Sequence, residues 1–494
     1  MRIRVVPTAS GKFAVQVVSK LHGVLTVHKH VGTYSNRSEK LLLCRAARDF
    51  IQETSRQISL LDLAASVRPF NIAVSENQPL FVYRMLTAVY AKLGLNKCPD
   101  PLIADLVVAR VYAPSSKRET REVLADLFGR RYSLKTVYRR LKTGIESGLK
   151  DTFQAALIQF AGSGLGDNLR LVFYDVTTLY FESTARSGIR DFGFSKDHRP
   201  IQTQIVVGLV VNPQGFPLYF DVFTGRTFEG HTFLPVVQNI RRLLGNPKLV
   251  VIADAAMISQ ANIDLLVQHR IGFVVGARMA NLPAGLIDTV SRRLNHRDGR
   301  TTMVAYRGQR LICQYLDSRA ARDKSDRLRQ IARAQVVVSS PAKLTGRYRF
   351  VTSAGSKYSL NSGLITKAEK LEGTKGYLTN TTLSRAVVIS RYHDLWRIEK
   401  SFRITKSDLE ARPIFHRLDE TIKAHLVVVF AGLAVSKYIE ISAGMSIQKV
   451  LKLAGKVLTH KITNTQTGET AYTETTIEDP ILRGKIDALR TLGH

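Results

Sequence analysis

Three side chains of different chemistry recur at seven-residue spacing near the C-terminal end. They are Tyr392, Glu399 and Lys406, in the run YHDLWRIEKSFRITK. On an α-helix seven residues turn through roughly 700°, so the three would lie along one stripe, with Arg403 beside it. A carboxylate flanked by hydrogen-bond donors that can bind phosphate suits metal-assisted chemistry on nucleic acid. A solvated helix face with ion pairs fits the same pattern.

Two further acids lie far upstream in apolar runs. Asp175 interrupts LVFYDV, and Asp254 ends VVIAD. A carboxylate at a buried strand is costly unless it is hydrogen-bonded, paired or bound to metal. If the two runs are adjacent central strands, both acids emerge at one sheet edge, where a later helix could bring Glu399.

Such a cluster of carboxylates would have a definite use. Converging acids repel one another and favour divalent cations, which can activate a water or a 3′-hydroxyl for phosphodiester cleavage. The alternative is that Asp175 and Asp254 cap turns or pair with arginines. Four other acids are candidates for the same role: Asp191, Asp197, Asp221 and Glu229. Asp221 also lies in a predicted strand, where it could support the catalytic acids.

The charge of the chain indicates a polyanionic partner. Its 494 residues carry 72 Lys and Arg against 40 Asp and Glu, a net charge of +32. Such an excess favours nucleic acid, because each neutralised phosphate releases counterions. It also fits an anionic membrane surface, but the longest strongly apolar run, 426–435, is too short to span a bilayer. We therefore predict no membrane association.

The positions of the cysteines and histidines argue against a fold held together by disulfide bonds or by zinc. Cys44, Cys98 and Cys313 are far apart and form no CxxC pair. This excludes a disulfide framework or a zinc ribbon and suits a reducing cytoplasm. The first residues lack the apolar stretch of a signal peptide. The histidines form no HExxH pattern, so we predict no structural zinc site.

The N-terminal third is predicted to bind DNA. Residues 1–35 alternate as a small β-hairpin unit, and 36–165 are mainly helical. Within the helical region, 119–144 reads as a helix-turn-helix whose second helix is capped by Ser133. A generic basic helical hairpin fits nearly as well. The basic residues that the second helix would present are Lys135, Arg139, Arg140 and Lys142.

An α/β core is predicted in two pieces, 166–276 and 384–440. The first piece has the order β-β-β-α-β-α-β, typical of a ribonuclease-H-like domain, with strands at 169–176 and 249–254. Helical signal resumes near 383 and runs to about 406, and a buried helix follows at 426–438. The remaining segment, 441–494, is expected to be a C-terminal tail, of which the last 35 residues, polar and threonine-rich, are expected to be loosely ordered.

Several motifs, in order, resemble the catalytic domain of bacterial insertion-sequence transposases of the DDE type. The resemblance covers about 165–435. Within this group, the chain is most similar to the cut-and-paste branch, which is marked by Tyr-x2-Arg-x3-Glu-x6-Lys. The motifs of the resemblance are FYDVTTLYFES from Phe173, FGFSKDHRP from Phe192, FTGRTFEGHT from Phe223, VIADAAM from Val251, the run from Tyr392, LEARPIFH from Leu409, and the later His425.

This resemblance implies an activity and a set of roles. It implies a ribonuclease-H-like catalytic core with a β-rich insertion at 277–383, before the glutamate helix. Asp175, Asp254 and Glu399 would be catalytic and bind Mg²⁺, for which Mn²⁺ often substitutes. Tyr392 and Lys406 would contact phosphates of the transposon end. Water would nick the element's terminal inverted repeats, and the freed 3′-hydroxyls would join target DNA within a homodimeric synaptic complex in the bacterial cytoplasm, at the nucleoid.

The chain departs from the signature at one position. Its arginine is replaced by Leu395, which we expect to pack in the core. Arg403 or Arg397 would then supply the missing phosphate contact, and Arg403 has the better helical phase.

Other candidate contacts are less specific. The loop residues Lys196, His198 and Arg199 fit DNA-backbone binding or a solvated loop, and His231 fits a structural hydrogen bond better than a ligand-orienting role. The only tryptophan, Trp396, lies outside the predicted insertion, which leaves the tyrosines at 306 and 315 as possible stacking faces.

Two other functions stay open. A structure-specific DNA nuclease on the same fold would need no inverted repeats beside its gene. A non-catalytic DNA-binding regulator would not need the three carboxylates.

Overall fold

The computed structural model describes residues 1–21, 23–55, 72–167, 169–194, 201–245, 248–257, 259–340, 348–354, 357–465 and 467–493. The chain divides into two compact units. The smaller contains Met1–Glu76 and Lys461–Thr473, and the larger contains Asn77–His460 and Glu474–His494. Each unit is described by itself below.

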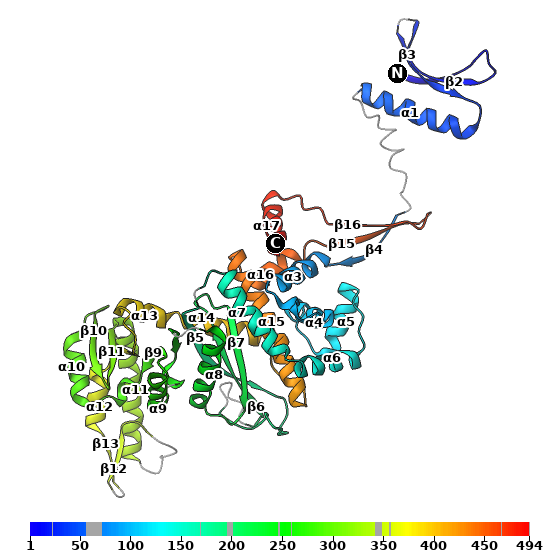
Figure 1. Ribbon diagram of the computed structural model, residues 1–494. Coiled ribbons are helices and arrows are strands. Elements are labelled where there is room, and N and C mark those ends of the chain that lie inside the picture. The colour runs from blue at the N-terminus through cyan, green and yellow to red at the C-terminus, as the bar shows by residue number, and fades with distance from the viewer. Residues whose placement is uncertain are drawn as a thin grey trace. The chain divides into compact units, whose positions relative to one another are not determined.

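The smaller unit begins with a three-stranded antiparallel sheet, β1 (Arg2–Pro7), β2 (Phe13–Leu21) and β3 (Val24–Tyr34), in that order. Helix α1 (Arg37–Ser55) packs on it (Figure 1), over a small core that includes Val15 and Tyr34. The predicted hairpin is thus a three-stranded sheet with a helix, because one hairpin alone buries too little apolar surface.

A second three-stranded sheet lies mostly in this unit, in the order β16 (Thr470–Glu474), β15 (Thr459–Asn464), β4 (Ile72–Gln78). The expectation that the last 35 residues are loosely ordered is wrong. They contain most of β15, all of β16 and α17 (Pro480–Arg490), which buries Ile486 and Leu489; α16 (Ile447–Ala454) precedes them in the tail. The prediction from sequence missed the short amphipathic helix α17 because most of the surrounding residues are polar.

The larger unit is built on an eight-stranded mixed sheet in the order β10-β11-β14-β9-β8-β5-β6-β7. Its central strands are fully or largely buried, as apolar runs such as QIVVGLVV require. Its strands are β5 (Leu171–Tyr180), β6 (Gln204–Val211), β7 (Pro217–Thr224), β8 (Val250–Ala253), β9 (Gly272–Ala277), β10 (Thr301–Tyr306), β11 (Gln309–Tyr315) and β14 (Thr374–Thr379).

The predicted order β-β-β-α-β-α-β is confirmed for the first part of this sheet, with α8 (Glu229–Leu244) and α9 (Gln260–Gln268) as its helices. The segment 277–383 differs from the expected β-rich insertion. Three of its strands continue the main sheet next to β9, while β12 (Val351–Ala354) and β13 (Lys357–Leu360) form a separate hairpin. It also contains three helices: α10 (Ala284–Leu294), α11 (Asp317–Ser339) and α12 (Ser362–Lys370).

A group of helices surrounds α15 (Asp419–Ala443), which contains the buried helix predicted at 426–438 (Figure 1). Among the described helices, α15 alone is long and apolar enough to cross a membrane by length and composition. Most of it is buried inside the protein, which makes it a core helix of this fold. Its neighbours are α3 (Leu80–Lys92), α4 (Pro101–Tyr112), α6 (Leu134–Glu146) and α7 (Leu149–Ser163); α5 (Lys117–Phe128) packs on α4 and α6.

Candidate active site

Asp175 and Asp254 follow matching positions of two neighbouring strands. Strands β5 and β8 are parallel, and Tyr174 pairs with Ala253, so the two aspartates come next in register. The half-buried Asp175 accepts a hydrogen bond from the backbone N–H of Val176 at 2.7 Å, whereas Asp254 is exposed. The expected adjacency of the two strands is confirmed, and it places both carboxylates at one edge of the sheet.

Glu399 lies on a separate short helix that packs on β5 and β6. The continuous helix expected from 383 to 406 is broken: α13 (Arg385–His393) ends before Asp394, and α14 (Trp396–Arg403) passes into a π-helix, Ile404–Asp408. Tyr392, Glu399 and Lys406 therefore lie on three consecutive elements and share no single helical stripe. α13 packs on β8, β9 and β14, and α14 packs on β5 and β6.

Tyr392 is hydrogen-bonded directly to Asp254. Its hydroxyl donates a hydrogen bond to Asp254 Oδ1 at 2.7 Å, and its ring is buried against Tyr377, with centroids 5.0 Å apart. Burial, and then this hydrogen bond, raise the pKa of the Tyr392 hydroxyl, which therefore stays a donor. The structure thus places Tyr392 as a positioning partner of a candidate catalytic carboxylate.

The contact depends on the glycine at position 276. A Cβ added to Gly276 in β9 would lie 2.5 Å from the Tyr392 hydroxyl and 3.0 Å from the Ala255 Cβ. The hydroxyl approaches Asp254 across the space that a side chain would fill.

We expect Gly276→Ala to separate Tyr392 from Asp254 and to lower the rate of DNA cleavage by about 10–100-fold, the usual cost of losing an outer-shell partner. Single-turnover cleavage assays measure the effect. Gly285→Ala, where an added Cβ meets nothing within 4 Å, is the matched control and should cleave normally. Wild-type cleavage by Gly276→Ala would show that this contact has no catalytic role.

Lys375 interacts electrostatically with two of the acids, Asp254 and Glu399, and was not among the residues predicted from sequence. It lies on β14, and its Nζ is 4.6 Å from the centre of the Tyr392 ring. Burial and then Arg319 lower the pKa of its amine, whereas Asp254 and Glu399 oppose that shift. Both carboxylates therefore lie near one ammonium group. A lysine in an otherwise buried strand, TKGYLT, is the sequence signal that would have identified it.

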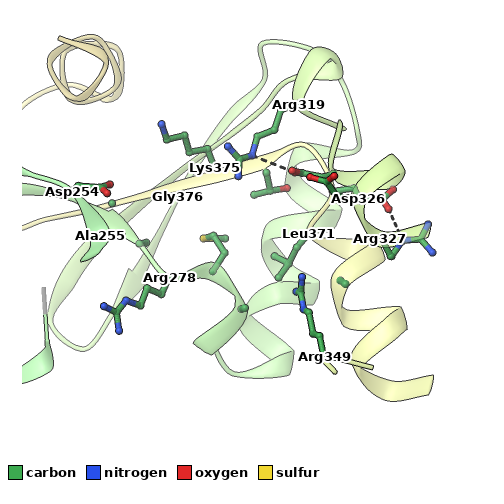
Figure 2. Close-up of a pocket in the computed structure, with 18 of the residues that line it drawn as sticks. Asp254, Ala255, Arg278, Arg319, Asp326, Arg327, Arg349, Leu371, Lys375 and Gly376 are labelled. Atoms are coloured by element: carbon green, nitrogen blue, oxygen red, sulfur yellow. Dashed lines mark hydrogen bonds and ion pairs between the residues drawn. The ribbon is translucent and has the colours of Figure 1, made fainter. Parts of the chain in front are cut away.

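An open pocket of about 460 Å³ extends from Asp254 toward α11 and α12 (Figure 2). Its lining includes the cations Arg278, Arg319, Arg349 and Lys375. Arg319 is paired with Asp323 at 3.3 Å. Such a lining presents donors suited to phosphate oxygens beside the candidate catalytic carboxylates. Arg327, in contrast, is buried between Glu369 and Glu372 and ties α11 to α12.

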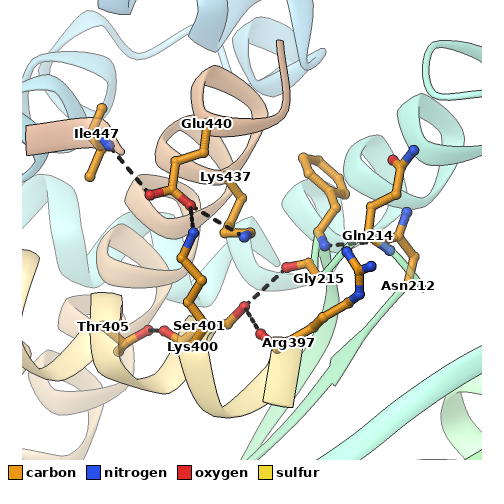
Figure 3. A network of polar contacts seen from close by, with 11 residues as sticks. Asn212, Gln214, Gly215, Arg397, Lys400, Ser401, Thr405, Lys437, Glu440 and Ile447 are labelled. Atoms are coloured by element: carbon orange, nitrogen blue, oxygen red, sulfur yellow. Dashed lines mark hydrogen bonds and ion pairs between the residues drawn. The ribbon is translucent and has the colours of Figure 1, made fainter. Parts of the chain in front are cut away.

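A polar network on the other side holds α14 in place (Figure 3). The fully buried Ser401 lies with its hydroxyl 3.0 Å from the carbonyl of Gly215, in the turn between β6 and β7. Lys400 reaches Glu440 of α15 at 2.9 Å, and Lys437 reaches the same carboxylate at 3.4 Å. Contacts with the turn between β6 and β7 and with α15 thus fix the helix that carries Glu399.

The predicted phosphate-binding cations occupy different surroundings. Leu395 is buried, as expected from its apolar character. Arg397 pairs with Asp394 at 3.4 Å and stacks on Trp396, whereas Arg403 is exposed on the last turn of α14. Lys406 is half-buried in the π-helix.

The helix-turn-helix predicted at 119–144 corresponds to α5 and α6. Gly129 ends α5 in the left-handed conformation, and the Ser133 side chain caps α6 as predicted. Lys135, Arg139 and Arg140 are exposed, and Arg140 lies 3.8 Å from Asp100. DNA binding by this face stays a prediction. The loop residues Lys196, His198 and Arg199 lie outside the described residues.

Several other candidates turn out to have structural partners. Asp191 pairs with Arg186 at 3.1 Å, and Asp221 pairs with Lys150 at 2.7 Å. His231 is exposed and packs against Phe228.

A mixed sheet that brings two carboxylates to adjacent strands, with a third on a packed helix, suits divalent-metal chemistry on phosphodiesters. Comparison with known families supplies the class: residues 168–433, more than half of the chain, match the transposase DDE domain. The chain belongs to this family and is a DDE transposase, an enzyme of DNA transposition and recombination.

Other comparisons add little. The structure is similar to a piggyBac transposase in a synaptic complex with hairpin DNA, with a TM-score of 0.38 and 9% sequence identity over 75% of this chain and 70% of that chain. This similarity is too low to carry an argument. No curated protein matches the chain.

DDE transposases depend on divalent metal ions, and the donor chemistry here fits such an ion. Within the described part of the chain, no three His, Cys, Asp or Glu side chains lie close enough together to hold one ion. Mg²⁺ is commonly bound by one or two carboxylates together with waters and substrate phosphates, so a pair of acids suffices. Each carboxylate has about four acceptor positions, more than the hydrogen bonds described above occupy.

Proposed function

We propose that this transposase binds the terminal inverted repeats of an insertion sequence, nicks the ends by metal-dependent hydrolysis and joins the 3′-hydroxyl ends to target DNA. The observation that carries the proposal is the register of β5 and β8, which puts Asp175 beside Asp254. Glu399 and Asp254 both interact electrostatically with the Lys375 amine.

In this account Asp175, Asp254 and Glu399 would hold Mg²⁺, or Mn²⁺ as a substitute, with no more than two of the three carboxylates on one ion and with waters and DNA phosphates as further ligands. The ion would supply Lewis acidity and lower the pKa of the attacking water or hydroxyl. Asp175 and Asp254 would hold the ion at the sheet edge, and Tyr392 fixes the carboxylate of Asp254 by its hydrogen bond. Lys375 offsets the repulsion between Asp254 and Glu399 before DNA arrives.

DNA would be held by cations around this edge. Arg397 and Arg403 lie on the glutamate helix and Lys406 follows it, and the pocket beside Asp254 adds further donors. The exposed face of α6 would bind the element's ends. We further propose that the active form is a homodimer that pairs two ends, at the nucleoid in the bacterial cytoplasm.

Arg403→Ala should slow end cleavage about tenfold, and more than Arg397→Ala does, because one phosphate contact is worth about 1–3 kcal/mol and Arg397 already pairs with Asp394. Cleavage rates of the two variants on the same end fragment measure this. The reverse order would contradict the assignment of Arg403 as the substitute for the missing signature arginine.

The function is tested by incubating the full chain with a plasmid that carries its gene and flanking DNA, with Mg²⁺ and with EDTA. Metal-dependent breaks at the element's two ends would support transposition. Metal-dependent cutting elsewhere would indicate a nuclease. Binding to the ends without breaks in wild-type protein would indicate a regulator.

A further inference from the structure

A second, smaller cavity lies away from the carboxylates, among the helices around α15. It measures about 150 Å³ and is lined by residues of α4, the start of α5, α6, the segment 410–416 and α15. That segment and His425 belong to motifs, LEARPIFH and the later histidine, for which the cleavage chemistry supplies no role.

Two buried cations face this cavity, and neither forms an ion pair with an acid within the described structure, although Glu410 lies near enough to Arg110 to oppose the lowering of its pKa by burial. Lys117 is 4% exposed, and among the residues that the structure describes it has neither a hydrogen-bond acceptor nor an ion-pair partner for its side chain. Arg110, also 4% exposed, donates only to carbonyl oxygens, those of Ser115 at 2.7 Å and Leu409 at 3.4 Å. Its Nε has no acceptor in the described structure.

The rest of the lining includes two histidines. The buried His425 donates from Nε2–H to the carbonyl of Ala411, so its Nδ1, which has no partner within the described residues, is an acceptor. Burial lowers the pKa of His416 to about 3 and that of His425 well below its usual value, so both rings are neutral and each carries one N–H. The one acid of the lining, Glu410, is exposed.

The backbone adds to the positive potential. Lys117 is the first residue of α5, whose Ser116 cap accepts from the N–H of Glu119. A helix N-terminus favours negative charge. Burial and Arg110 lower the pKa of the Lys117 amine, which is the expected cost of a buried cation without a counter-ion. An anion in the cavity would remove this cost and accept from the unused donors.

We propose that this cavity binds one phosphate-class oxyanion, either a backbone phosphate of bound DNA or free phosphate. A cavity of this size has room for a tetrahedral anion. Because Tyr138 of α6 stacks edge-on against His416, with ring centroids 6.1 Å apart, an anion here would connect the predicted DNA-binding helix to the segment that follows the glutamate helix. Only the DNA source of the anion rests on the proposed function.

Free phosphate is tested first. The unfolding midpoint of the wild-type chain is measured against inorganic phosphate, with chloride holding ionic strength constant. A free-phosphate site predicts a saturable rise, absent in Lys117→Met. Lys324→Met makes the same chemical change at an exposed helical position and should keep the full response. The wild-type titration needs no variant, and Lys117→Gln replaces Lys117→Met if the latter does not fold.

The DNA source is tested by measuring the affinity for an end fragment at several salt concentrations. A single backbone phosphate in the cavity predicts that Lys117→Met lowers the magnitude of the log–log salt slope by about 1, whereas Lys324→Met leaves the slope unchanged. A wild-type response to phosphate assigns free phosphate, and a change in slope without that response assigns the DNA backbone. Absence of both effects would overturn the proposal. Failure of DNA cleavage alone would overturn the proposed function and leave the phosphate titration intact.

Discussion

Replacement of Asp254 by asparagine is expected to abolish metal-dependent DNA cleavage while leaving end binding nearly intact. Asparagine keeps an oxygen that can accept the hydrogen bond from Tyr392, but it loses the charge that a divalent ion requires. Loss of metal stabilisation worth several kcal/mol corresponds to a rate decrease of about 10³-fold or more. Asp175→Asn and Glu399→Gln should behave alike.

Gel-shift and cleavage assays on one end fragment separate the two effects. Asp264→Asn, in the exposed part of α9, provides the same chemical change away from the sheet edge and should cleave at the wild-type rate. Any one of the three site variants that cuts at the wild-type rate would remove that residue from the active site.

Replacement of Glu440 by alanine is expected to have the largest effect on stability. Glu440 is 8% exposed, and its carboxylate accepts from the buried Lys437, from Lys400 and from the backbone N–H of Ile447 (Figure 3). Removing one partner from a buried ion pair costs about 3–5 kcal/mol, because the remaining charge is left without compensation. The unfolding midpoint should therefore fall by several degrees, and α14 should lose one of its anchors.

Glu420→Ala is the control, since Glu420 is exposed in the first turn of the same helix. It should change the midpoint little. If Glu440→Ala unfolds at the same temperature as Glu420→Ala, the network does not contribute to the stability of the fold. Cleavage by Glu440→Ala below its unfolding temperature reports separately whether the network also positions Glu399.

The sheet edge could be predicted from the sequence because its signals are local. An aspartate inside or at the end of a short apolar run identifies a buried strand with a costly charge, and this holds for Asp175 and Asp254. Serine caps such as Ser133 are equally local, because a side-chain oxygen two or three residues before the N–H it caps needs no distant partner.

Other features depend on contacts between distant residues. The seven-residue spacing of Tyr392 and Glu399 suggested one helix, but the chain turns at Asp394, and Tyr392 packs toward β9 where Gly276 leaves room. Lys375 joins the site from a strand beyond β9 in the sheet, a pairing that no local pattern reveals. The unpartnered Lys117 is likewise evident only once α4, α5 and α15 are assembled.

Strand transfer tests the central claim most directly. A pre-cut end fragment with a free 3′-hydroxyl is incubated with a supercoiled plasmid, Mg²⁺ and the full chain, and joined products are separated by size. A transposase whose catalytic acids are Asp175, Asp254 and Glu399 joins the fragment covalently through that hydroxyl, and Asp254→Asn does not. Plasmid nicking without any joined product, or joining that persists in Asp254→Asn, would contradict the account.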